Sequence, residues 1–408
     1  MERPIIQLPI MVVICLSNNE MNFIKLDYSQ FGLKENPFPY SGVPDSAPSF
    51  YVGQNDVLET INTTISSIIF SGRSNHLIIT GSYGNGKSHT LKYIKSNIPK
   101  QIWEKLHVSC TVGYVSQPGD TFLDIYRDFM YDIGFSFFQT CAEEYIGSVA
   151  HQLSQEGKLK VTIPPSRGWA MIENGDVLLS DVIPAATMQL NEHVKYMDFT
   201  RAFLNLVYDE NAMYCWEWLN GEGLEYTIRK NLQLTRNLTP KHSLRSFQAL
   251  KDLIFELGHS PLLILIDEFE YIASLQARTR QNMLNSLRHL MDMNPEGLSI
   301  ILACAPEVWQ SLIADYHAFS ERIGKESTLK PLERENLRSL IIAYLNTQRF
   351  EKSNTIYPFT EEALQELHAL GQGNIRRIIT LASQSLDFSI QNSKQVIDED
   401  VIHEMINL

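Results

Sequence analysis

The stretch HLIITGSYGNGKS, residues His76–Ser88, decides the fold. Its first part, 76–80, is a short apolar run of the kind that forms a buried strand. Its second part, 81–88, fits the pattern G-x-x-x-x-G-K-[ST] at every defined position, and apolar residues at helical spacing follow between 91 and 98. A strand, a glycine-rich loop and a helix in this order predict a phosphate-binding loop in an α/β fold.

Each part of this loop has a chemical task in binding ATP and Mg²⁺. The glycines let backbone N–H groups turn inward around a phosphate, Lys87 neutralises phosphate oxygens, and the Ser88 hydroxyl is a ligand for Mg²⁺. The alternative is a glycine-rich turn that carries a lysine by chance, and the flanking strand and helix favour the binding loop. The residues expected to bind the nucleotide here are Gly81, Ser82, Tyr83, Gly84, Asn85, Gly86, Lys87, Ser88 and His89.

A second apolar run, LLILIDEFE at Leu262–Glu270, predicts a central parallel strand. Its acidic pair stands at the carboxyl end, which is the edge where parallel sheets bind ligands. We expect Asp267 to hold Mg²⁺ and Glu268 to orient and deprotonate the attacking water in ATP hydrolysis. Acidic residues also follow apolar runs where a strand only reaches solvent, so the interpretation depends on the accompanying loop.

Strand and helix patterns alternate on both sides of these two runs. We expect helices over 56–70, 119–133, 243–257 and 277–291, and further strands over 106–112 and 298–304. Such alternation is typical of a parallel sheet covered by helices, so the predicted core is a three-layer αβα P-loop fold. Residues 134–200 lose a clear period and resemble an irregular insertion.

Composition shifts along the chain predict three parts. Residues 1–50 are expected to form an N-terminal extension and an extended arm, because 33–50 carries four prolines. Residues 51–332 form the predicted ATPase core, and 333–408 an all-helical lid domain. Within the lid, Thr360 is a plausible N-cap and Gly371 a plausible helix stop. The lid helices are expected over 334–346, 361–370, 374–388 and 399–406.

Composition excludes several classes of protein. With 44% hydrophobic and 20% charged residues the chain can bury a full core, and its net charge of −13 argues against coating nucleic acid nonspecifically. The five scattered cysteines include no CxxC pair, so we expect a cytoplasmic protein without disulfides or zinc. The apolar segment Ile10–Leu16 is too short to span a membrane. A natural chain start is also plausible at Met21, which would make residues 1–20 an upstream extension.

The motifs GSYGNGKSH, LLILIDEFE and GQGNIRR together resemble AAA+ ATPases of the origin-recognition-like clade. More narrowly, GSYGNGKSH, CWEWLNGEGL (Cys215–Leu224) and the stretch from DEFE to ACAPE look like the ATP-binding proteins of BREX phage-defence islands. The opening FGLKENPF is also similar to bacterial ExeA-type and transposon-regulator ATPases. This resemblance covers the chain from about Phe31 onward, except 134–200, and implies a homo-oligomer that binds ATP between subunits.

The resemblance assigns further residues to the site. Arg322 in SERIG resembles the arginine finger that reaches a neighbouring subunit's phosphate, although a surface arginine paired with Glu321 or Glu326 is an alternative. Arg376 in GQGNIRR resembles the sensor-2 arginine, with Arg377 pointing elsewhere, although a solvent-exposed arginine at a helix start remains open. Tyr51 and Val52 resemble the element beside adenine, and a plain hydrophobic staple is an equal contender.

One position departs from the family pattern. Sensor 1 usually offers Asn, Ser or Thr after the fourth strand, whereas this chain has Ala303, Cys304, Ala305 and Pro306. A missing hydroxyl or amide weakens the positioning of water. The sequence therefore leaves slow hydrolysis open, with ATP acting as a switch.

Three functions remain open. The first is an oligomeric AAA+ switch or motor in double-stranded DNA transactions such as phage defence, and the second an origin-type or transposon-regulator-like DNA-binding ATPase. Only about thirty residues follow Arg376, too few for an appended winged-helix reader, which counts against the second. The third is a scaffold that binds a protein partner. Residues 227–251 hold six basic and no acidic residues, which suits a DNA backbone, a solvated face or an acidic partner.

Overall fold

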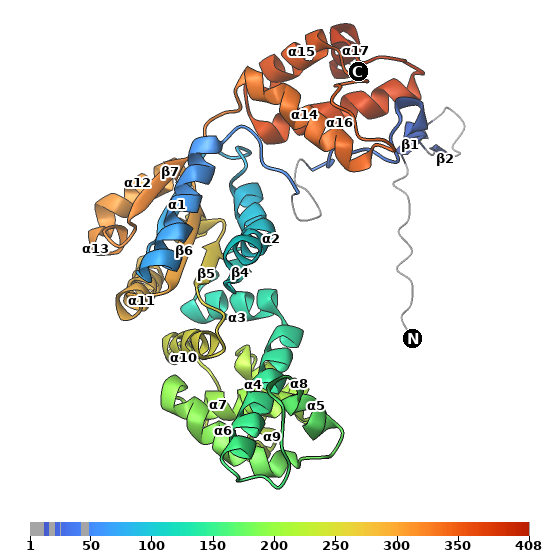
Figure 1. The fold of residues 1–408 in the computed structure, drawn as a ribbon. Coiled ribbons are helices and arrows are strands. Elements are labelled where there is room, and N and C mark those ends of the chain that lie inside the picture. Colours follow the sequence, from blue (N-terminus) through green and yellow to red (C-terminus); the bar gives the residue numbers. More distant parts are fainter. Residues whose placement is uncertain (1–11, 16–20, 25, 42–48, 408) are drawn as a thin grey trace. The chain divides into compact units, whose positions relative to one another are not determined.

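The computed structural model describes residues 12–15, 21–24, 26–41 and 49–407 (Figure 1). Contacts divide the chain into two compact units. The first holds residues 1–55, 84–86 and 330–408, and the second holds 56–83 and 87–329. The split near residue 330 falls beside the position where the sequence pattern changes to helices alone. The assignment of arm, core and lid remains an interpretation.

A five-stranded parallel sheet forms the centre of the second unit, in the order β4-β5-β6-β3-β7. The carboxyl ends of β3 and β6 are level, because Thr80 lies opposite Cys304. The predicted parallel sheet is confirmed, and the strand predicted as central lies inside it with a neighbour on each side. The strands are β3 (Leu77–Thr80), β4 (Thr111–Val115), β5 (Leu262–Ile266), β6 (Leu298–Cys304) and β7 (Lys325–Thr328).

Helices cover both faces of this sheet. Alternate strand residues such as Leu77, Leu263 and Ile301 pack against α1 (Asn55–Ser71) and α2 (Lys87–Leu106). Their neighbours Ile78, Ile264 and Ile300 point to the other face. That face is covered by α3 (Phe122–Ile133), α10 (Ser243–Glu256), α11 (Ala277–Met293) and α12 (Pro306–Asp315), and the short α13 (His317–Ser320) follows. The predicted three-layer α/β fold is confirmed.

Two strand boundaries differ from the prediction. The strand expected over 106–112 begins at Thr111, because α2 continues to Leu106. The strand expected over 262–270 ends at Ile266, and the 3₁₀ helix η4 (Phe269–Ser274) follows. Strand β7 has no clear signal in the sequence, because only one of its four residues is buried.

Residues 134–200 are helical, so the expectation of an irregular insertion is wrong. The region lacks a clear hydrophobic period, yet Pro184 lies inside a helix and Pro165 opens the 3₁₀ helix η2 (Pro165–Arg167). Gly147 allows a close approach, since a Cβ there would lie 2.6 Å from the Trp169 nitrogen. The helices from here to α10 are α4 (Phe135–Gln155), α5 (Gly168–Glu173), α6 (Leu179–Val194), α7 (Met197–Leu204), α8 (Ala212–Leu219) and α9 (Tyr226–Asn231), with η3 at Asn205–Val207.

The first unit is a helical body that the N-terminal arm completes. Phe31, Leu33 and Phe38 are buried in its core, and η1 (Tyr28–Phe31) begins the arm. The Lys34 N–H donates to the Gln348 carbonyl at 2.8 Å. Its helices are α14 (Arg334–Gln348), α15 (Glu361–Gly371), α16 (Ile375–Gln391) and α17 (Glu399–Ile406), and β1 (Val12–Cys15) pairs antiparallel with β2 (Met21–Ile24).

Two predicted helix signals have different outcomes. Thr360 is confirmed as an N-cap, because its hydroxyl accepts from the Ala363 N–H at 3.2 Å. Gly371 is not the helix stop, since it remains in α15 and Gln372 takes the left-handed cap position with φ +52°. Among the described residues, no helix is both long enough and apolar enough to cross a membrane.

Candidate nucleotide site

The loop 81–86 joins the carboxyl end of β3 to Lys87, the first residue of α2. Gly84 has φ +84° and Gly86 φ +96°, which are conformations that glycine adopts without strain. The Gly81 N–H donates to the Cys304 carbonyl at 3.3 Å, so the start of the loop is fixed to β6. The backbone thus turns tightly at the N-terminus of a 20-residue helix, where partial positive charge attracts anions.

Lys87 is buried, with 9% of its surface exposed. Its Nζ donates to the Gly81 carbonyl at 2.7 Å and lies 3.9 Å from Glu270 Oε1. An ammonium held among oxygens in a glycine-rich turn is the arrangement that a phosphate site requires. Ser88 and His89 follow in the first turn of α2 and are both partly exposed.

Asp267 directly follows β5 and is 2% exposed. Its Oδ2 accepts from the Tyr114 hydroxyl at 2.8 Å, and its Oδ1 accepts from the Glu268 N–H at 2.9 Å. Burial and the Asp267 carboxylate raise the pKa of Tyr114, so Tyr114 keeps its proton and donates. Each carboxylate oxygen has further lone pairs, so both bonds leave capacity for a metal ligand.

Glu268 has the unusual backbone φ of +45°. A non-glycine residue in this region costs about 1–3 kcal/mol, and such strain gathers at functional sites. The side chain is exposed, and Gln117 Nε2 donates to Glu268 Oε2 at 3.5 Å. The strained turn thus places an exposed carboxylate next to the buried one of Asp267.

Glu270 is a site residue that the sequence analysis missed. Its Oε2 accepts from the Ala305 N–H at 3.2 Å, and its Oε1 faces Lys87. It therefore places a polar group at the end of β6, where Cys304 and Ala305 lack one. Burial raises the pKa of the Cys304 thiol to about 12, with Glu270 adding to the shift, so this cysteine stays protonated at neutral pH. The sequence signal that could have identified Glu270 is the motif DEFE, in which acidic residues stand on both sides of Phe269.

These residues fit a magnesium–nucleotide group. The tight glycine turn at a helix start and the buried Lys87 suit phosphate oxygens. Ser88 and Asp267 offer the hard oxygen ligands that Mg²⁺ prefers. The structure brings the predicted loop and acidic pair to one edge of one sheet, while their individual roles remain predictions.

Arg322 lies on the surface of the second unit after α13. Its Nε donates to Asp292 Oδ1 at 2.9 Å, and its Nη1 lies 3.5 Å from Glu321 Oε2. The alternative pairing with Glu321 is thus present, whereas Glu326 accepts from the Trp309 indole instead. The role of Arg322 toward a neighbouring subunit remains a prediction.

The start of α16 lies beside the tip of the glycine-rich loop within the first unit. The Arg376 N–H donates to the Gly84 carbonyl at 3.1 Å, and a Cβ on Gly84 would lie 2.4 Å from Asn374 Oδ1. Arg376 is partly buried and Arg377 is exposed, in the order that the resemblance implied. The sensor-2 role of Arg376 remains a prediction.

Tyr51 and Val52 are partly exposed, and Val52 packs against the core of the first unit. Their neighbour Phe50 makes an edge-to-face contact with Tyr344, with ring centroids 4.9 Å apart. These packing contacts agree with the staple alternative and leave the adenine contact untested.

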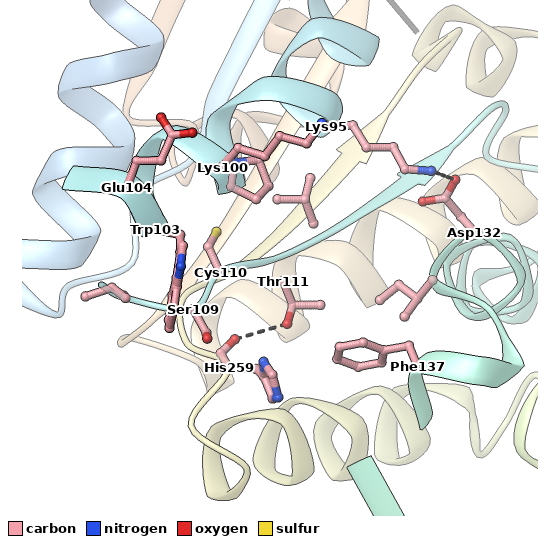
Figure 2. Close-up of a pocket in the computed structure, with 14 residues that line it drawn as sticks. Lys95, Lys100, Trp103, Glu104, Ser109, Cys110, Thr111, Asp132, Phe137 and His259 are labelled. Atoms are coloured by element: carbon pink, nitrogen blue, oxygen red, sulfur yellow. Dashed lines mark hydrogen bonds and ion pairs between the residues drawn. The ribbon is translucent and has the colours of Figure 1, made fainter. Parts of the chain in front are cut away.

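A separate open cavity of about 570 Å³ lies in the second unit at the amino end of β4 (Figure 2). Lys100 and Trp103 from the far end of α2 line it, together with Phe137 and His259. The Thr111 hydroxyl donates to the His259 carbonyl at 3.1 Å across its floor. No residue of the glycine-rich loop lines this cavity, so it is distinct from the candidate nucleotide site.

The same fold occurs in a protein of solved structure. The Aeropyrum pernix ORC2 protein in its ADPNP–ADP complexes has a TM-score of 0.51 and 10% identity, over 88% of this chain and 70% of that chain. Its ADP form has a TM-score of 0.50 and 10% identity, over 92% and 73%. The fold is therefore that of an AAA+ P-loop protein of the origin-recognition-like type. The chain belongs to the family of the BREX system ATP-binding protein BrxC/D, whose family model matches residues 41–405.

A curated relative matches only in part. The uncharacterized HTH-type transcriptional regulator MJ0774 of Methanocaldococcus jannaschii is 26% identical over 145 residues. This match spans 36% of this chain and 34% of that protein, so the chain covers about a third of the relative's length.

Proposed function

We propose that this protein is a cytoplasmic AAA+ ATPase that hydrolyses ATP with Mg²⁺ at the loop 81–88. The observation that carries the proposal is the common sheet edge on which a buried Lys87, a buried Asp267 and a strained, exposed Glu268 all stand. ATP would supply the phosphoanhydride bond that is cleaved.

Each residue has one task in this proposal. Lys87 and the loop amides bind the phosphate oxygens, and Ser88 and Asp267 hold Mg²⁺. Glu268 orients the attacking water and takes its proton, because its carboxylate is exposed next to the buried Asp267. Arg376 and the pair Tyr51 and Val52 would complete the binding of the nucleotide.

We further propose that the protein acts as a homo-oligomeric switch or motor in DNA transactions such as phage defence, with other proteins of the same system. Membership of the BREX family supports this role. Arg322 would reach the nucleotide bound to a neighbouring subunit. To do so, its guanidinium must leave the Asp292 carboxylate and bind phosphate oxygens instead.

One observation favours a slower variant of this function. The end of β6 offers Cys304 and Ala305 in place of a hydroxyl or amide, and the Cys304 thiol stays protonated. A scaffold or switch that holds ATP and turns it over slowly is therefore the second candidate.

Steady-state ATP hydrolysis over a protein concentration series, with and without double-stranded DNA, separates the two candidates. Activity per chain that rises with protein concentration and with DNA supports the oligomeric DNA-linked machine. Light scattering of the Glu268→Gln protein with ATP gives the oligomeric state directly. A monomer that ignores DNA contradicts the first candidate, and negligible turnover despite ATP binding favours the second.

A further inference from the structure

We propose that four exposed cations of the second unit, Lys195, Arg236, Lys241 and Arg245, form a surface that binds the phosphodiester backbone of duplex DNA. We call these four residues the basic surface. This inference adds a DNA contact to the proposed function and rests on the proposed role in DNA transactions. It does not rest on ATP hydrolysis.

The basic surface gathers residues from separate segments. Lys195 caps the end of α6, Arg236 and Lys241 lie in the connection before α10, and Arg245 is in the first turn of α10. Arg245 Nη2 donates to the Lys195 carbonyl at 3.1 Å. Arg236 Nη1 lies 3.4 Å from His242 Nε2, which joins the connection to the start of α10.

The buried Tyr196 side chain contacts the basic surface from the protein interior. The Arg245 guanidinium lies 4.2 Å from the centre of the Tyr196 ring. The charges of both Arg236 and Arg245 act on the Tyr196 hydroxyl, where they oppose a rise of its pKa that is caused mainly by burial. Arg245 is thus fixed by a ring and a carbonyl, so less side-chain entropy is lost when it binds an anion.

The four cations are not paired with acidic side chains of the described residues. Within the described part of the chain, none of the four forms a salt bridge, although acidic residues outnumber basic ones by 47 to 34 in the full sequence. The charge of Asp198 also acts on Tyr196, but this carboxylate is only 4% exposed. It accepts hydrogen bonds from the Thr235 N–H, at 3.0 Å, and from the Thr235 hydroxyl. The start of α10 adds partial positive charge at the same place.

The chemistry of the surface favours phosphates over bases or an acidic protein. Tyr196 is 6% exposed, so the ring that holds Arg245 is not free to stack on a base. Between Arg236 and Lys241 the exposed residues include Thr239 and Pro240, and Leu238 is buried, so this connection offers no apolar centre of the kind that protein interfaces bury. Cations without such a centre are suited to the uniform charge of a nucleic-acid backbone.

The structure also corrects the extent of the basic stretch seen in the sequence. Lys251 lies 3.6 Å from Asp252 and covers the Phe255 ring, and Arg229 lies over Tyr226. Lys195, which lies outside 227–251, joins the surface through Arg245. The contact is therefore defined by the fold around Tyr196 and not by the run of sequence.

The test is the salt dependence of DNA binding by the full chain. Fluorescence anisotropy of a labelled duplex is measured over a range of NaCl concentrations for the wild type and for Arg236→Glu/Lys241→Glu. Among the described residues neither side chain pairs with a carboxylate, and the one side-chain contact of Arg236 is the long one to His242 Nε2. We therefore expect the change to leave the packing intact, which an unchanged melting temperature verifies. Lys158→Glu/Lys352→Glu is the matched control, with the same charge change at exposed lysines elsewhere.

We expect the surface variant to bind more weakly and its plot of log affinity against log salt to be flatter by about 2, one for each lost phosphate contact. The control should keep the wild-type slope. The inference is overturned if the wild type ignores the duplex, if the surface variant and the control have equal slopes, or if polyglutamate competes as well as unlabelled duplex at equal charge. Because no hydrolysis is measured, failure of the ATPase proposal would not affect this result.

Discussion

Glu268 and Glu270 stand two residues apart and differ in surroundings. Glu268 is exposed on a strained backbone, whereas Glu270 binds the Ala305 N–H and faces Lys87. We expect Glu270 to be a positioning residue that holds the end of β6 and competes with phosphate for Lys87. It would thereby replace part of the polar group that Cys304 and Ala305 lack.

The Glu270→Gln protein tests this role through nucleotide affinity. The amide oxygen can still accept from the Ala305 N–H, but the negative charge beside Lys87 is gone. We expect ATP to bind roughly three- to tenfold more tightly, which is a modest gain because water screens a partly exposed pair. Titration with a fluorescent ATP analogue measures this change in affinity. The control is Glu307→Gln, which removes the charge of an exposed acidic residue nearby. Unchanged or weaker binding would contradict the role.

His76 predicts a pH dependence of stability. Its Nδ1 accepts from the Ile300 N–H at 3.1 Å, and burial lowers its pKa from 6.5 to about 4. The folded chain therefore keeps a neutral His76 at a pH where the unfolded chain takes up a proton. The contribution is full above pH 6.5 and is lost as the pH falls toward 4, by about 3 kcal/mol in total.

Chemical unfolding at a series of pH values measures this loss. His76→Asn is the comparison, since an amide oxygen can accept from the Ile300 N–H without titrating. We expect the free energy of unfolding of the wild type to fall more steeply between pH 6.5 and 4 than that of the variant. Parallel curves would show that His76 does not carry the effect.

At the scale of elements, the apolar runs were sufficient to predict β3, β5 and β6. Four or more consecutive buried residues make such strands visible in sequence, and the motifs at their ends made Lys87, Asp267 and Glu268 visible as well. β7 was not visible, because it is an edge strand with one buried residue. Glu270 was missed because its contacts with Lys87 and Ala305 join segments distant in sequence.

The helices α4 to α7 were missed for a different reason. Residues 134–200 lack a clear hydrophobic period, and Gly147 and Gly168 let two helices touch backbone to backbone. Such contacts depend on tertiary packing, which a local pattern does not contain.

The pair β4 and α3 offers a test of such close packing. A Cβ on Gly113 would lie 2.2 Å from Phe129 Cε2, and Phe129 is fully buried. Gly113→Ala should therefore destabilise the protein by about 1–3 kcal/mol through overpacking. Thermal and urea unfolding measure this. The double variant Gly113→Ala/Phe129→Leu should cost less than the sum of the two single changes, and simple additivity would contradict the proposed clash.

At the scale of the whole molecule, N-terminal and C-terminal segments of the chain together form the first unit. The arm residues Phe31 and Phe38 share a core with helices from the C-terminal part. The second unit carries the sheet, the acidic pair and Arg322. If ATP hydrolysis depends on assembly, a residue of one molecule must act on the nucleotide that is bound to another molecule.

Arg322→Ala tests that dependence. We expect turnover to fall at least tenfold at high protein concentration, because an arginine finger is worth about 10³–10⁵ in rate, while ATP binding by the dilute protein is kept. Arg288→Ala is the matched control, since Arg288 approaches the same Asp292 carboxylate at 4.0 Å. Equal effects of both variants would indicate a structural ion pair and contradict the finger.

The most direct test of the central claim compares ATP binding and ATP turnover in the Glu268→Gln protein with Mg²⁺ present. The account predicts that labelled ATP binds with nearly wild-type affinity while turnover falls by about 10²-fold or more, because only proton transfer from water is removed. Wild-type turnover in this variant would contradict the assignment of Glu268 and with it the proposed catalytic site.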